Sequence, residues 1–102
     1  MESRTTREFW KQLKSLPAEI QKAAEVAYDK FRSNPSHPSL HLERLRCDPR
    51  AWSVWVTRDV RAVALRVQRQ AAEDKAKGSS AEESWLWFWI GHHVDFDKRF
   101  PA

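Results

Sequence analysis

Trp85-Leu86-Trp87-Phe88-Trp89-Ile90 is the segment with the strongest structural signal in this sequence. Every residue in it is apolar, whereas a strand with one solvated face alternates apolar and polar residues. The uncharged run around it (84–94) is 11 residues long, and a membrane-spanning helix needs about 20. We therefore predict a central β-strand that is covered on both faces, with its three tryptophans packed in the core on one face.

Two segments before this strand have the pattern of a β-hairpin. Residues 52–56 alternate in polarity, and residues 60–67 are rich in β-branched side chains. The short segment 57–59 between them makes an antiparallel hairpin the simplest interpretation. In the second strand Arg61 shares one face with the other odd-numbered residues. Trp55 lies opposite the apolar face of its own strand, where it could stack or contact a partner.

The first third of the chain predicts a helical hairpin of roughly 30 residues. Thr5 and Glu8 have the spacing of a capping box. Pro17 suits the first position of a second helix, and the pair at 34–35, Asn-Pro, ends that helix. Residues 40–43 alternate again and predict a further strand. The expected fold class is α+β, with the two-helix hairpin packed on a twisted, mostly antiparallel four-stranded sheet.

A single domain accounts for residues 1–102, because a 12.0 kDa chain is long enough for one core without disulfides or a structural metal. Residues 68–84 join helix formers to a Gly-Ser-Ser breaker and predict a long solvated loop. The lone Cys47 excludes an internal disulfide framework, favours a reducing, cytoplasmic setting, and packs by default in the core. The first residues lack the apolar stretch of a secretory signal.

The charge distribution favours a polyanionic partner. Lys and Arg number 18 against 14 acidic residues, so the net charge is +4. Residues 34–67 hold six arginines, no lysine and three acidic residues. Arginine presents a planar donor fork that suits phosphate. A solvated sheet edge that arginine keeps soluble is the alternative interpretation.

Signatures of common cofactor and metal sites are missing from the sequence. Gly78 and Gly91 are the only glycines, so there is no glycine-rich phosphate loop. Neither His-Glu-x-x-His nor Gly-x-Ser-x-Gly occurs, and the four histidines lack metal-ligand spacing. We therefore expect no cofactor and no metal.

Histidine and arginine remain as candidates for chemistry. His92 and His93 follow the central strand, where a histidine could act as an acid or base near neutral pH. Packing or hydrogen bonding at the sheet end is the alternative. Arg61 lies early in its strand and could stabilise a phosphorane-like charge. Its alternative role is a salt bridge with Asp59 or Asp95.

Five short motifs occur in order along most of the chain. They are Leu16-Pro17-x-Glu19-Ile20-Gln21, Asn34-Pro35-Ser36-His37-Pro38-Ser39-Leu40-His41, Trp52-Ser53-Val54, Arg61-Ala62, and Trp87-Phe88-Trp89-Ile90-Gly91 followed by His93. In this order they resemble the RelE/ParE superfamily of toxins from bacterial type II toxin–antitoxin systems. The resemblance implies a cognate antitoxin that wraps and blocks the toxin in a hetero-oligomeric complex. Many members are metal-independent, ribosome-dependent mRNA endoribonucleases that inhibit translation, so the implied partners also include the ribosome and mRNA, and no membrane.

The resemblance also implies roles for single residues. Arg61 matches the sheet arginine that neutralises the phosphate, and His93 matches the histidine that acts as an acid or base. The expected RNA contacts are Arg44, Arg46 and Arg58, and the auxiliary candidates are His41, His92 and Phe96.

Three positions depart from the family pattern. Phe96 stands where relatives usually have a tyrosine, and phenylalanine can stack but cannot transfer a proton. Trp55 stands at a position that is often basic, and Val60 where a tyrosine is common. The principal hypothesis is an mRNA interferase toxin. A ParE-like inhibitor of DNA gyrase without nuclease activity and a non-toxic antitoxin-binding domain are the alternatives.

Overall fold

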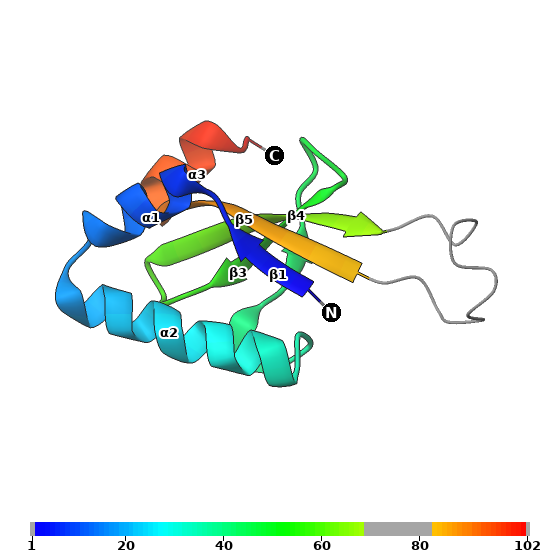
Figure 1. Ribbon diagram of the computed structural model, residues 1–102. Coiled ribbons are helices and arrows are strands. Elements are labelled where there is room, and N and C mark those ends of the chain that lie inside the picture. Colours follow the sequence, from blue (N-terminus) through cyan, green and yellow to red (C-terminus); the bar gives the residue numbers. More distant parts are fainter. Residues whose placement is uncertain (1, 69–82, 102) are drawn as a thin grey trace.

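The chain forms one five-stranded sheet with helices on both faces (Figure 1). The computed structural model describes residues 2–68 and 83–101. The elements in chain order are β1 (Glu2–Thr5), α1 (Arg7–Lys14), α2 (Ala18–Ser33), the 3-10 helix η1 (Pro38–Leu40), β2 (Glu43–Arg44), β3 (Ala51–Trp55), β4 (Val60–Gln68), β5 (Glu83–His92) and α3 (His93–Arg99). The strand order is β1-β5-β4-β3-β2. β5 therefore lies inside the sheet, as its sequence predicts.

A layer of apolar side chains joins the sheet to the helical hairpin of α1 and α2. Phe31 of α2 is 1% exposed, and its ring packs edge-on against Trp85 at 5.0 Å and Trp87 at 5.1 Å between centroids. α1 is tied to the sheet by Gln12, whose side-chain oxygen accepts a hydrogen bond from the Ile90 N–H at 3.0 Å. The predicted α+β arrangement of a two-helix hairpin on a sheet is confirmed.

A β-bulge at Phe88 changes the face on which Trp89 lies. Val63 pairs with Trp89 and Ala64 pairs with Trp87, so Phe88 is an extra residue in β5. The extra residue reverses the alternation of side chains beyond it. Trp89 therefore packs with Val63 on the face away from the hairpin. The prediction that all three tryptophans share one face is wrong for Trp89, whereas the strand is covered on both faces as expected.

The N-terminal strand β1 makes the sheet five-stranded rather than four-stranded. Its residues have no apolar alternation, and its backbone pairs in parallel with β5. The Thr6 N–H donates to the Trp87 carbonyl at 2.9 Å, and the Trp87 indole donates to the Ser3 hydroxyl at 3.0 Å. Hydrogen bonding to the open edge of β5 therefore fixes a polar segment as a strand. Thr6, not Thr5, caps α1, because its hydroxyl accepts the Phe9 N–H.

The strand predicted at residues 40–43 is replaced by η1 and the two-residue strand β2. Pro38 occupies the first position of η1, where proline is favourable. The helix ends at His41, which has a left-handed backbone with φ 47° and ψ 48°. Leu40 is buried to 1% exposure in the layer beneath the hairpin. A tight turn, rather than strand pairing, thus buries this leucine.

The short helix α3 follows β5 directly and packs on the sheet face opposite the hairpin. Phe96 of α3 and the adjoining Phe100 contact Trp89, with ring centroids 6.1 and 5.5 Å away. The sequence pattern does not predict this helix. His93 is therefore the first residue of a helix rather than part of a loop.

Other segments agree with the sequence analysis to differing degrees. Asn34 ends α2 as predicted, whereas Pro17 precedes the first helical residue instead of occupying that position. Cys47 is exposed, so its expected burial is wrong. The loop predicted at 68–84 falls outside the described residues except at its ends, where the prediction is wrong because Gln68 belongs to β4, and Glu83 and Ser84 belong to β5. Among the described helices, none has the length and apolar character needed to cross a bilayer.

We expect Phe31→Ala to lower the free energy of unfolding by about 3–5 kcal/mol, because it removes a buried ring from between two tryptophans. Urea denaturation followed by circular dichroism measures this change. Tyr28→Ala, one turn earlier on α2 at 37% exposure, is the matched control and should cost less than half as much. Equal losses for the two variants would contradict this account of the core.

Candidate functional site

The guanidinium of Arg61 is anchored at one end by the turn between β3 and β4. In the sheet Arg61 lies opposite Trp55 on β3 and Gly91 on β5. Its Nη1 donates to backbone carbonyls of that turn, at 2.8 Å to Arg58 and 3.2 Å to Thr57. Within the described part of the chain, its Nε and Nη2 have no hydrogen-bond partner. Three of the five N–H donors thus remain available to a ligand.

The charge of Arg61 is not neutralised by a contacting carboxylate. Partial burial lowers the pKa of Arg61, and the negative charges of Asp97 and Asp59 act in the opposite direction. Neither of them, nor Asp95, lies within ion-pair distance of the guanidinium among the described residues. The alternative role in a salt bridge with Asp59 or Asp95 is therefore not realised. A partly desolvated cation without a direct counter-ion favours binding of an anion.

Trp55 is the centre of a stacked cluster. The Cζ atom of Arg61 lies 4.2 Å from the centroid of the Trp55 ring, which is a cation–π contact. His41 stacks on the same side chain, with centroids 3.8 Å apart and an interplanar angle of 26°. Trp55 is half-buried, whereas His41 is exposed. The tryptophan that the sequence left open for stacking therefore already has two stacking partners within the protein.

His93 lies at the same end of the sheet. Its backbone N–H donates to the Asp59 carbonyl in the β3–β4 turn at 2.6 Å, which ties the start of α3 to that turn. Its Nε2 lies 3.3 Å from Oδ2 of Asp97, one helical turn later. The side chain of His93 is 48% exposed. The charge of Asp97 is also the main electrostatic influence that opposes the lowering of the Arg61 pKa, so this carboxylate contacts His93 and acts on Arg61 from beyond ion-pair distance.

Gly91 leaves space for the indole ring of Trp89. A Cβ atom at Gly91 would lie 2.9 Å from Cζ2 of Trp89, because the indole folds over the glycine. Trp89 in turn holds α3 through Phe96 and Phe100. Phe96, an auxiliary candidate, therefore packs in the apolar cluster under α3.

The remaining predicted residues are spread over the surface. Arg58 is exposed in the turn that anchors Arg61, and His92 is exposed at the end of β5. Arg44 pairs with Trp52, whose side chain packs on the hairpin side of the sheet, so Arg44 lies on the opposite face from Arg61. Arg46 is exposed after β2. The structure thus brings together Arg61, Arg58, His93 and, through Trp55, His41, but not Arg44.

Asp97 is a member of this cluster that the sequence analysis does not identify. Its spacing of four residues from His93 becomes informative only once a helix is assigned to α3. The described residues contain no group of three His, Cys, Asp or Glu that could hold a metal ion.

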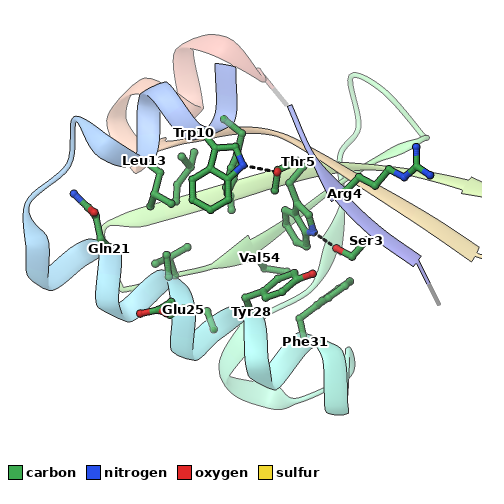
Figure 2. Close-up of a pocket in the computed structure, with 17 residues that line it drawn as sticks. Ser3, Arg4, Thr5, Trp10, Leu13, Gln21, Glu25, Tyr28, Phe31 and Val54 are labelled. Atoms are coloured by element: carbon green, nitrogen blue, oxygen red, sulfur yellow. Dashed lines mark hydrogen bonds between the residues drawn. The ribbon is translucent and has the colours of Figure 1, made fainter. Parts of the chain in front are cut away.

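A separate apolar groove of about 390 Å³ lies on the hairpin side of the sheet, between α1, α2 and strands β1, β3 and β5 (Figure 2). Leu13, Tyr28 and Val54 line it. Trp10 is 49% exposed beside it and donates from its indole to the Thr5 hydroxyl at 2.6 Å. No pattern in the sequence predicts this groove.

The fold is similar to those of known toxins, although neither a family model nor a curated protein matches the sequence. A YoeB/ParE toxin from Agrobacterium tumefaciens is 18% identical with a TM-score of 0.64, and the match covers 91% of this chain and 99% of that one. The match to the RelB–RelE antitoxin–toxin complex from Methanococcus jannaschii has 12% identity and a TM-score of 0.63, and it covers 95% of this chain and 98% of that one. A copper-bound mutant toxin from Helicobacter pylori is 14% identical with a TM-score of 0.55, and the match covers 93% of this chain and 97% of that one. The chain therefore has the RelE/ParE toxin fold, as the motifs predict.

We expect inorganic phosphate to bind at Arg61 and to shift its Nε–H resonance in a saturable NMR titration. Asp97→Asn should tighten this binding by up to about fivefold, because it removes a negative charge that opposes the anion. Asp95→Asn, on the same helix, is the matched control and should change the affinity less. An unchanged affinity in Asp97→Asn, or an equal increase in the control, would contradict the assignment.

Proposed function

We propose that this protein is the toxin of a type II toxin–antitoxin system and that it cleaves mRNA on the ribosome. The observation that carries the proposal is Arg61, whose free donors and unneutralised charge suit a phosphate. The toxin fold supports the general role. An exposed histidine, His93, lies at the same end of the sheet as Arg61 and supports the chemistry of strand cleavage.

Cleavage in this proposal needs no metal. The ribose 2′-oxygen attacks the phosphorus of its own 3′-phosphate, a cyclic 2′,3′-phosphate forms, and the 5′-oxygen of the next nucleotide leaves. Arg61 stabilises the negative charge that develops on the phosphate oxygens. His93 carries out one of the two proton transfers, either from the attacking hydroxyl or to the leaving oxygen. Asp97 holds the His93 ring from one side.

Arg58 is proposed to bind the RNA backbone beside Arg61, and two arginines outside the cluster are proposed to bind RNA or the ribosome elsewhere on the surface. Arg58 is nearest to Arg61 along the chain and is exposed in the same turn. Arg46 and Arg44 would contact the RNA or the ribosome further away, across the edge strand β2. These contacts position the message and are salt-dependent. The protein would act in the cytoplasm, where ribosomes and mRNA are found.

The proposed protein partner is a cognate antitoxin that docks in the hairpin groove. One of the structural neighbours is a toxin bound to its antitoxin. The groove is apolar and borders β1, an edge strand whose outer backbone groups can pair with an added strand. An antitoxin segment with apolar anchors would cover the exposed part of Trp10.

One observation favours a second candidate function. Phe96 supplies no hydroxyl for proton transfer, and its ring is packed under α3. A ParE-like inhibitor of DNA gyrase would not need such a group. Inhibition of gyrase supercoiling by the purified protein, without loss of translation in a parallel assay, would support that alternative. Normal growth when the chain is expressed alone would support a non-toxic antitoxin-binding domain.

We expect Arg61→Ala to lower mRNA cleavage by about 100- to 1,000-fold, because it removes the cation at the phosphate. His93→Ala should lower it by at least about 100-fold through loss of proton transfer. Both variants should relieve growth arrest and stay folded. Primer extension on a message during expression measures cleavage, and circular dichroism checks the fold.

Arg50→Ala is the matched control for charge, because Arg50 is an exposed arginine near Asp48 and outside the cluster. It should keep nearly full activity. If both site variants remain folded and fully toxic, the assignment of Arg61 and His93 is wrong.

We expect Trp10→Glu to weaken antitoxin binding at least tenfold, because it places a charge in the apolar groove. Growth arrest in the absence of antitoxin should be unchanged. Co-purification and calorimetry with the product of an adjacent small reading frame measure this. Val94→Glu, at a residue 60% exposed on α3, is the control and should bind normally. If Val94→Glu weakened antitoxin binding as much as Trp10→Glu, the antitoxin would not be docked specifically in the groove.

A further inference from the structure

His41 occupies the outer position of the aromatic stack beside Arg61. Its ring lies nearly parallel to that of Trp55 at 3.8 Å, and the residue is exposed. Trp55 contacts both His41 and Arg61 and is half-buried, whereas His41 is exposed. The imidazole of His41 is therefore the more exposed of the two rings in this stack and the one that we consider for a ligand.

The backbone of His41 is held in an uncommon conformation. It is the single non-glycine residue with positive φ in the described part of the chain. Its N–H donates to the Pro38 carbonyl at 3.3 Å, which closes the η1 turn. Such conformations persist where surrounding contacts hold them, and they concentrate at binding sites. Here the stack on Trp55 and the turn together fix the direction of the imidazole.

We propose that the exposed face of His41 binds a nucleobase of the RNA strand whose phosphate lies at Arg61. Both groups contact the Trp55 ring, so the imidazole centroid and the guanidinium carbon are within about 8 Å of each other. This span is comparable to the distance between a base and a neighbouring phosphate in one strand. A flat ring beside a phosphate-binding cation is the arrangement with which proteins hold single-stranded RNA.

The proposal assigns separate tasks to the three residues, and it rests on the proposed function. Arg61 binds the phosphate, His41 stacks on the base, and Trp55 is a positioning residue that keeps the two in register. Stacking accepts every base because each has a π-face, so this subsite adds affinity rather than strict sequence preference. His41 therefore acts in binding rather than as the catalytic auxiliary that the sequence suggests.

The test measures the affinity of the protein for ribosomes programmed with an uncleavable mRNA. The scissile nucleotide carries a 2′-deoxy sugar, and primer extension with the wild-type protein first locates that nucleotide. Two further mRNAs carry an abasic site on the 5′ or the 3′ side of the scissile phosphate. Wild type and His41→Asn are compared on all three, because asparagine tolerates the left-handed backbone but has no aromatic ring.

We expect His41→Asn to weaken binding of the intact mRNA by about tenfold, the scale of one base–aromatic stack. On one of the abasic mRNAs the same substitution should change the affinity by less than about twofold, since the stacked base is already missing. His41→Tyr should restore most of the affinity. His37→Ala alters the same turn at the side chain that accepts the Ser39 N–H, and it should bind like wild type.

Two results would overturn the nucleobase subsite. One is an equal effect of His41→Asn on the intact and both abasic mRNAs, and the other is an equal loss of affinity in His37→Ala. A wild-type protein that cleaves mRNA but gives either result refutes this subsite alone. A wild-type protein that neither binds programmed ribosomes nor cleaves mRNA refutes the proposed function as well.

Discussion

The β-bulge at Phe88 determines which side chains of β5 face each layer of the structure. Before the bulge, Trp85 and Trp87 point toward the hairpin and enclose Phe31. After it, Trp89 points to the other face and supplies the apolar surface on which α3 packs. Without the extra residue Trp89 would belong to the hairpin layer, and α3 would lose its principal anchor. The position of His93 at the start of α3 therefore follows from a backbone irregularity five residues earlier.

The environment of Arg61 contains one feature that disfavours the charged guanidinium and three that stabilise it. Partial burial disfavours the charged form of the guanidinium. The carbonyls of the β3–β4 turn, the face of Trp55 and the more distant charges of Asp97 and Asp59 offset that cost. None of these groups is an anion in direct contact with the guanidinium. The cation is thus held in one orientation while its free donors stay available, which is the electrostatic preorganisation that a phosphate site requires.

The sequence was sufficient for the parts of this fold that depend on burial. Residues 85–90 predict their strand correctly because a strand covered on both faces must be apolar. Residues 60–67 predict theirs because they are rich in β-branched side chains and follow the preceding strand after a short turn. β1 could not be predicted in this way, since hydrogen bonding to an open sheet edge defines it and its side chains are polar. The bulge at Phe88 has no sequence signal in a run where every residue is apolar. The sequence could indicate Arg61 and His93 but not Asp97, because the relation of Asp97 to both residues depends on α3, which the sequence did not predict.

The hairpin groove and the side chain of Arg61 lie on opposite faces of the same strands. Val54 and Ile90 line the groove, and their immediate neighbours Trp55 and Gly91 belong to the Arg61 side. A ligand in the groove therefore lies against the same strands that carry Arg61, but on the opposite face from its guanidinium. Under the proposed function, an antitoxin confined to the groove would leave Arg61 open to RNA. Direct blockage thus requires the antitoxin chain to continue around a sheet edge, so that affinity and inhibition come from two different segments.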